Sequence, residues 1–165
     1  MGLTVSGREN WSPEACKAVI AAHKRVEGAT LPILHAIQAT FGHIPDEALP
    51  LLADALNLTR AEVYGIVTFY HDFRRQPPGR HVLRLCRAEA CQSMGGDALA
   101  DRMRQELAID WHGTTTDGTV TLEPVYCLGL CTTGPAAMLD GTPLGRLDAS
   151  RLTEILDTVR CPPPQ

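Results

Sequence analysis

The chain has 165 residues, of which 44% are hydrophobic and 21% are charged, with a formal net charge of -4. This length and composition are typical of a globular protein that buries a hydrophobic core without needing disulfide bonds. The negative charge argues against nucleic-acid binding, because neutralising phosphates requires a basic face. The sequence has no apolar run near the roughly 18 residues of a membrane span, so we expect no membrane insertion.

The N-terminus has no basic segment followed by an apolar stretch, and so no secretory signal is expected. We therefore expect a cytoplasmic protein in which the six cysteines stay reduced. In that setting, metal binding or redox chemistry is a more common use of cysteine than disulfide formation.

The first eighty residues are predicted to be helical. Ser12 is a helix start signal, because its side-chain oxygen can accept from a free backbone amide. The first helix is expected to end near Gly28, with Val26 on its imperfect apolar face. A second helix is expected over residues 31–41, ended by Gly42 in the left-handed conformation.

Two further helices are expected before the character of the chain changes. Asp46 and Glu47 are expected to open the third, and Thr59 with Glu62 has the spacing of a capping box before a fourth helix over residues 60–69. Two prolines and a glycine within residues 76–79 cannot continue a helix.

We place a domain boundary at this point, and predict an N-terminal helical domain over residues 1–79 and a second domain over residues 80–165. The second domain alternates strands and helices. The expected elements are a strand over 81–85 before Cys86, a helix over 96–107, a strand over 119–126, a strand over 136–139 with a hairpin turn at Asp140 and Gly141, and a final helix opened by Asp148 or Ser150. This order predicts a small α/β sandwich on a mixed sheet.

Four of the six cysteines follow predicted strands, in two pairs. Four residues separate Cys86 from Cys91, and three separate Cys127 from Cys131. Because strand ends are rigid and the following loops are free to vary, two loops at one sheet edge can present four thiolates to one metal centre. The wide spacing of both pairs favours a [2Fe-2S] cluster on four cysteinates.

Other uses of these cysteines remain open. Structural zinc takes cysteines two to four residues apart, so either pair is also compatible with half of a zinc site. A disulfide between Cys86 and Cys91 in a redox sensor is a further alternative, whereas the C-x-x-C motif of a thioredoxin-type enzyme is absent.

The neighbours of the cysteines suit a cluster, although ordinary turns and an exposed charge explain them equally well. Glycines at 95, 96, 129 and 134 can let the chain wind tightly and aim amides at sulfur. Amide donors and the charge of Arg87 would raise the potential of an anionic cluster.

The other candidate residues have no partners at ligand spacing. We expect Cys16 to be buried or incidental, Cys161 to be exposed, and the six histidines to be structural or solvated. The sequence has no glycine-rich phosphate loop, so no nucleotide site is expected in this chain.

Several short segments carry a family resemblance: Gln38, residues 41–42, residues 44–45, residues 67–70, residues 78–79, Cys86, residues 127–131 and Pro135. Together they span residues 11–159 and resemble the 24-kilodalton [2Fe-2S] subunit family of NADH dehydrogenase (complex I). The chain departs from that subunit at Gly134, where alanine is usual, and at Asp140, where asparagine is common.

The resemblance implies an α+β protein, with an N-terminal helical bundle followed by a thioredoxin-like α/β domain. It also implies one [2Fe-2S] cluster per chain on Cys86, Cys91, Cys127 and Cys131. Residues 71–74 and 86–92 are most similar to the gamma subunit of soluble, NAD-dependent, molybdenum-containing formate dehydrogenase.

The same resemblance implies a non-catalytic electron-transfer subunit. A partner subunit is expected to bind FMN and NAD, and a third chain to oxidise formate at molybdenum. The equivalent subunit of complex I or of an NAD-reducing hydrogenase is the alternative, and a zinc-stabilised interaction module is an alternative of another class. Val67, Phe69 and Tyr70 are expected to contact the flavin-bearing partner or, as the alternative, to form internal core.

Overall fold

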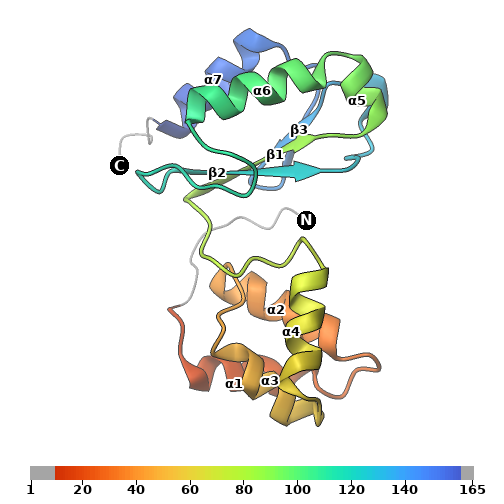
Figure 1. Ribbon diagram of the computed structural model, residues 1–165, viewed down its shortest axis with the longest axis vertical. Helices are drawn as coiled ribbons and strands as arrows, with labels where there is room; N and C mark the ends of the chain where they lie inside the picture. Colours follow the sequence, from red (N-terminus) through yellow and green to blue (C-terminus); the bar gives the residue numbers. More distant parts are fainter. Residues whose placement is uncertain (1–9, 161–165) are drawn as a thin grey trace. The chain divides into compact units, whose positions relative to one another are not determined.

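The computed structural model of this chain describes residues 10–160 (Figure 1). These residues divide between Pro77 and Pro78 into two compact units, a helical unit and an α/β unit. The predicted domains, residues 1–79 and 80–165, remain a prediction about independently folding parts. Within residues 10–160, each helix is too short or too polar to span a bilayer.

The helical unit contains α1 (Pro13–His23), α2 (Thr30–Phe41), α3 (Ala48–Leu56) and α4 (Arg60–Phe69). One hydrophobic core joins the four helices. Its fully buried large side chains come from α2, the loop after it, α3 and α4: Ile33, Leu34, Ile37, Ile44, Leu52 and Val63. This core forms because the apolar residues of each helix recur on one face.

Local capping explains where these helices begin and end. The Ser12 hydroxyl accepts from the amide of Ala15 at 3.1 Å, as its start signal predicts. Thr59 and Glu62 form the predicted capping box before α4, and Gly42 ends α2 in the left-handed conformation.

One prediction in this unit is wrong. The first helix ends at His23 rather than near Gly28, and Val26 lies outside it with 53% of its surface exposed. The chain turns instead, with the Val26 amide bonded to the His23 carbonyl and Gly28 left-handed at φ 66°.

The segment after α4 is attached to α2 by one side chain. The amide group of Gln38 donates to the Asp72 carbonyl at 2.7 Å and accepts from the Arg74 amide at 2.6 Å. The Arg74 carbonyl in turn accepts from the amide of Ile44 at 2.7 Å. These bonds fix residues 72–74 on the helical unit without any regular secondary structure.

The α/β unit contains the remaining elements: β1 (His81–Cys86), α5 (Glu89–Ser93), α6 (Gly96–Leu107), β2 (Val120–Val125), the short 3-10 helix η1 (Cys131–Thr133), β3 (Ala137–Leu139), β4 (Thr142–Leu144) and α7 (Ala149–Arg160). The sheet order is β2-β1-β3-β4. The β1–β2 pair is parallel, and the β1–β3 and β3–β4 pairs are antiparallel, which makes the predicted mixed sheet.

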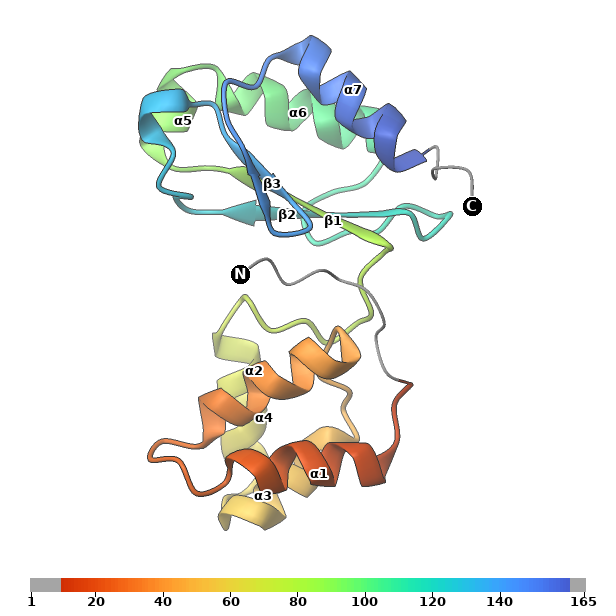
Figure 2. The same ribbon diagram turned by 180° about the vertical axis from the view of Figure 1, so that it is seen from behind.

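Helices α6 and α7 cover the same face of this sheet (Figures 1 and 2). Alternate residues of β1 and β2 point toward them, because successive side chains of a strand face opposite ways. The shared core contains Leu83, Leu85, Ala100, Met103, Val120, Leu122, Leu152 and Leu156. The sheet therefore gives a rigid base to the loops that follow β1 and β2.

Candidate metal centre

The two parallel strands β1 and β2 bring both predicted cysteine loops to one edge of the sheet. Cys86, the last residue of β1, is paired in register with Val125, the last residue of β2. The next amide, that of Arg87, donates to the Val125 carbonyl at 2.7 Å. Cys127 therefore begins the second loop beside the start of the first.

The first pair of cysteines is buried. Cys86 ends its strand, and the short helix α5 carries Cys91 back toward it. Gly96, at the start of α6, packs tightly against this turn, since a Cβ there would lie 2.6 Å from the Cys91 carbonyl oxygen. The junction between α5 and α6 therefore requires glycine and fixes the position of Cys91.

The second pair is exposed, and its two sulfurs already lie at a metal-sharing distance. The Sγ atoms of Cys127 and Cys131 are 3.8 Å apart. Two thiolates on one tetrahedral metal ion, each with a bond of about 2.3 Å, have sulfurs about 3.8 Å apart. The Gly129 amide also donates to the Cys127 sulfur at 3.4 Å.

Hydrogen bonds to the Cys86 sulfur connect the two loops. Burial raises the pKa of the Cys86 thiol, but these hydrogen bonds outweigh burial and leave the pKa below its ordinary value. The donors, in falling order of effect, are the amide of Ala88, the thiol of Cys91, and the amides of Cys127 and Leu128. Two donors thus come from the second loop.

The other thiols also respond to one another. Burial, and then the neighbouring Cys86, raise the pKa of Cys91. The hydrogen bond and charge of Cys127 raise the pKa of Cys131, to which Cys86 adds a smaller effect. Among residues 10–160, no three His, Cys, Asp or Glu side chains converge on the position of a single metal ion.

The four cysteines fit a two-iron cluster in donor type, pairing and amide supply. Each pair can hold one iron, and such clusters take four cysteinates with amide hydrogen bonds to sulfur. Apolar side chains surround the buried pair and limit water there: Ala88, Val125, Leu128, Leu130 and Ala136.

Arg87 is directed to a different group from the one its sequence position suggests. Its guanidinium lies 3.2 Å from the Asp97 carboxylate and 5.3 Å from the centre of the Trp111 ring. Asp97 is in the first turn of α6. Arg87 therefore connects the first cysteine loop to α6 as well as carrying a charge near the centre.

The remaining cysteines lie apart from this centre or outside the described residues. Cys16 is fully buried in the helical core, as expected, and burial raises its pKa to about 11. Cys161 lies outside the described residues. Among the histidines, His81 pairs with Asp140 at 2.7 Å, which supports a structural role at the far end of β1.

Sequence reasoning missed the backbone part of the site. The sulfurs receive hydrogen bonds from several amides, and Cys127 itself has a left-handed φ of 87°. Amide groups carry no residue-type signal, and a non-glycine residue in this region is uncommon. The glycine at position 129, with φ 75°, is the only signal of the tight turn within this loop.

The comparison with protein families gives one match across most of the chain. The family model described as thioredoxin-like [2Fe-2S] ferredoxin matches residues 16–160, which includes all four cysteines of the centre.

Relatives with this similarity are named as one of the subunits of NADH-quinone oxidoreductase. The protein from Mycobacterium tuberculosis is 32% identical over 149 residues, and the match covers 90% of this chain but 59% of that protein. The Pseudomonas aeruginosa protein is 34% identical, with 78% of each chain covered. The Escherichia coli K12 protein is 33% identical, with 87% of each covered.

A solved structure shares the fold. An NAD+-reducing [NiFe]-hydrogenase in its air-oxidised state superposes with a TM-score of 0.69 and 27% identity, covering 82% of this chain and 23% of that chain. The family match, the identities and the fold agree with the geometry of the cysteines. The chain belongs to the thioredoxin-like [2Fe-2S] ferredoxin family, and its cofactor is a [2Fe-2S] cluster.

Proposed function

We propose that Cys86, Cys91, Cys127 and Cys131 hold the [2Fe-2S] cluster and that the chain is an electron-transfer subunit of an NAD-linked oxidoreductase. The observation that carries this proposal is the hydrogen bonding of the Cys86 sulfur by amides of the second cysteine loop. It supports a single centre shared by the two loops.

The residues of the chain have separate tasks in this function. The four sulfurs bind the irons, and the amides of Ala88, Leu128 and Gly129 donate hydrogen bonds to them, which favours the more negative, reduced state. The cluster supplies one-electron exchange when it is bound. The chain offers no nucleotide loop, so the partner of this exchange is expected to carry the flavin and NAD.

Two parent complexes are candidates. A complex of the NADH-quinone oxidoreductase or NAD-reducing hydrogenase type is supported by the names of the relatives and of the solved structure. An NAD-dependent formate dehydrogenase, with a catalytic molybdenum subunit, is supported by residues 71–74 and 86–92 alone. We favour the first, and we infer a cytoplasmic location because thiolate ligands stay reduced there.

The flavin-bearing partner is proposed to be a separate chain. The match to the hydrogenase covers 23% of that chain, so a region similar to this protein is part of a longer polypeptide there. The residues described here correspond to that region, and we propose that another subunit supplies the equivalent of the remainder.

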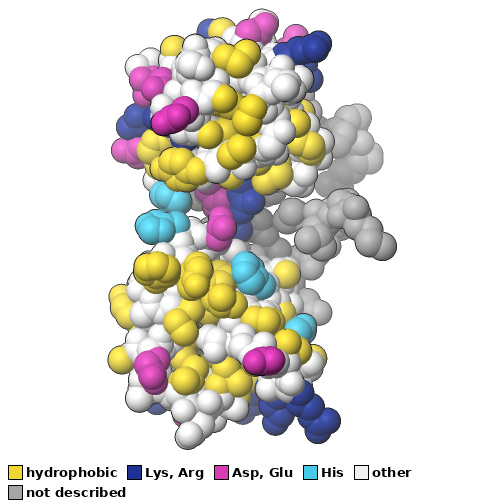
Figure 3. Space-filling view, turned by 90° about the vertical axis from the view of Figure 1, so that its right-hand side faces the viewer, with side chains coloured by type: hydrophobic (Ala, Val, Ile, Leu, Met, Phe, Trp, Pro, Cys, Tyr) yellow, Lys and Arg dark blue, Asp and Glu magenta, His cyan; other side chains and the backbone are white. Residues whose placement is uncertain are grey.

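The helical unit offers an aromatic surface for such a partner. Val67 is buried, so the alternative of internal core holds for it, whereas Tyr64, Phe69 and Tyr70 are exposed. Figure 3 shows hydrophobic side chains gathered on this unit. Exposed aromatic groups of this kind are typical of protein interfaces.

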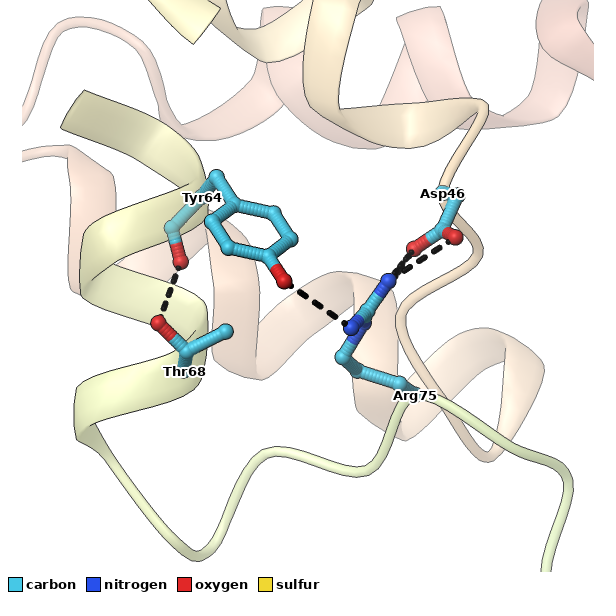
Figure 4. Close-up of polar contacts among 4 residues, drawn as sticks. All are labelled: Asp46, Tyr64, Thr68 and Arg75. Atoms are coloured by element: carbon cyan, nitrogen blue, oxygen red, sulfur yellow. Dashed lines mark hydrogen bonds and ion pairs between the residues drawn. The ribbon is translucent and has the colours of Figure 1, made fainter. Parts of the chain in front are cut away.

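Polar contacts within the unit hold this surface in place (Figure 4). The Arg75 guanidinium lies 5.1 Å from the centre of the Tyr64 ring and donates to both oxygens of Asp46 at 2.7 and 2.9 Å. The Thr68 hydroxyl donates to the Tyr64 carbonyl at 2.9 Å. The polar groups are satisfied internally, so a partner would meet a preformed aromatic surface.

Iron and sulfide analysis of the purified chain, with visible absorption and EPR after reduction, tests the proposal. We expect two irons and two sulfides per chain and a reduced-state EPR signal. A colourless, zinc-containing protein would select the interaction module. Reversible oxidation of two thiols without iron would select the redox sensor.

A further inference from the structure

Met94 and Gly134 bring the two cysteine loops into contact at the surface of the centre. Met94 directly follows α5, the helix that carries Cys91. Gly134 directly follows η1, which begins at Cys131. A contact between them therefore joins the loop of the first cysteine pair to the loop of the second.

The missing side chain of Gly134 provides the space for this contact. A Cβ at Gly134 would lie 3.1 Å from the Met94 sulfur and 3.5 Å from the Cys91 sulfur. Both sulfurs therefore lie around one point beside the Gly134 backbone. Gly134 and Cys91 are buried, whereas Met94 is 50% exposed, so the thioether forms the outer layer.

Glycine is needed here for space and not for backbone conformation. Gly134 has φ -67° and ψ 163°, an extended conformation open to any residue. An alanine Cβ at 3.1 Å from the thioether is closer than ordinary van der Waals contact. Since the methionine end is flexible, we expect it to move outward by a few tenths of an ångström rather than the backbone to shift.

We infer that Met94 is a covering residue: its thioether, resting against Gly134, shields the Cys91 side of the centre from water. This inference rests on the proposed ligand role of Cys91. Apolar cover around a metal site controls solvent access and the local dielectric, and through them the reduction potential. Water stabilises the more negative reduced state, so the cover keeps the potential lower and slows iron loss.

The test uses the full-length, cluster-loaded chain and two measurements besides electron transfer: the rate of iron release to a chelator and the midpoint potential in a redox titration. We expect Met94→Ala to release iron several-fold faster and to raise the midpoint potential. Met94→Leu keeps the apolar bulk and is expected to match the wild type. Gly65→Ala, in open space on α4, is the matched control for glycine substitution.

A double-variant comparison tests the contact itself. Gly134→Ala is expected to speed iron release by displacing Met94, and this effect is expected to vanish when Met94 is already alanine, because residues in contact act non-additively. Additive effects, or a Met94→Ala protein that behaves as the wild type, would overturn this inference alone. A wild-type chain without [2Fe-2S] absorption would overturn the proposed function, and this inference with it.

Discussion

The backbone amide of Arg87 donates a 2.7 Å hydrogen bond to the carbonyl of Val125, and this bond joins the two cysteine loops at their origin. Arg87 follows Cys86 directly, and Val125 precedes Cys127 by two residues. The parallel register of β1 and β2 therefore continues one residue into the site. Core packing under the sheet is in this way connected to the positions of the sulfurs.

The left-handed turn at Gly129 is expected to be needed for a stable centre. Gly129 has φ 75°, and its amide donates to the Cys127 sulfur. Alanine in this conformation costs about 1–2 kcal/mol, so we expect Gly129→Ala to lose iron faster. Iron release to a chelator measures this. Gly65→Ala, in a helix, is expected to leave the release rate unchanged, and equal rates for both variants would contradict the role of the turn.

The two predicted domains can be tested by separate core substitutions. Leu34 is fully buried in the helical unit, and Leu122 is fully buried in the α/β unit. Each change to alanine is expected to cost about 2–5 kcal/mol in its own unit. If the units fold independently, Leu34→Ala melts earlier by circular dichroism while visible absorption of the cluster persists, whereas Leu122→Ala loses both together. Loss of absorption with the first transition of Leu34→Ala would show that they fold as one.

The stability of the helical unit is expected to fall at alkaline pH because of Cys16. Burial raises the pKa of this thiol to about 11, whereas an unfolded cysteine titrates near 8.5. Its contribution is therefore complete below about pH 8.5 and is lost as the pH rises through about 11, by roughly 3 kcal/mol.

Urea unfolding at several pH values measures this dependence. Lysine and tyrosine titrate in the same range, so the informative quantity is the difference in pH dependence between the wild type and Cys16→Ala. Identical slopes in the two proteins would show that Cys16 does not titrate differently on unfolding.

The exposed aromatic surface is expected to bind the flavin-bearing partner. Phe69 is 72% exposed and packs edge-to-face on Tyr70, with ring centres 5.1 Å apart. If Phe69 is a central contact, Phe69→Ala weakens partner binding by about 2 kcal/mol or more, at least about tenfold in Kd. Co-purification and titration of the complex measure this. Val26→Ala, which also shortens an exposed apolar side chain, is the control, and equal affinity for both variants would remove this surface from the interface.

The sequence predicted those parts of the fold that local chemistry determines. Thr59 and Glu62 form a capping box from their spacing alone, and Asp140 with Gly141 makes the hairpin between β3 and β4. The strand before Cys86 ends where predicted because apolar alternation stops there. Such signals lie within a few residues of one another.

Features that depend on distant residues were not predictable. The five-residue helix α5 is too short to show apolar periodicity, and its position depends on Gly96 packing against the Cys91 backbone. Met94 shows no functional pattern in the sequence, because the space beside Gly134 exists only after the two loops meet. The left-handed conformation of Cys127 is likewise unexpected for a residue with a Cβ.

The most direct test of the proposed centre compares cysteine variants of the full chain by iron and sulfide content and by the EPR spectrum after reduction. We predict that Cys86→Ser and Cys127→Ser, one from each loop, lose the cluster or alter its spectrum, and that Cys16→Ala keeps the wild-type content and spectrum. An unchanged spectrum in Cys127→Ser, or equal loss in Cys16→Ala, would contradict a cluster held between the two loops.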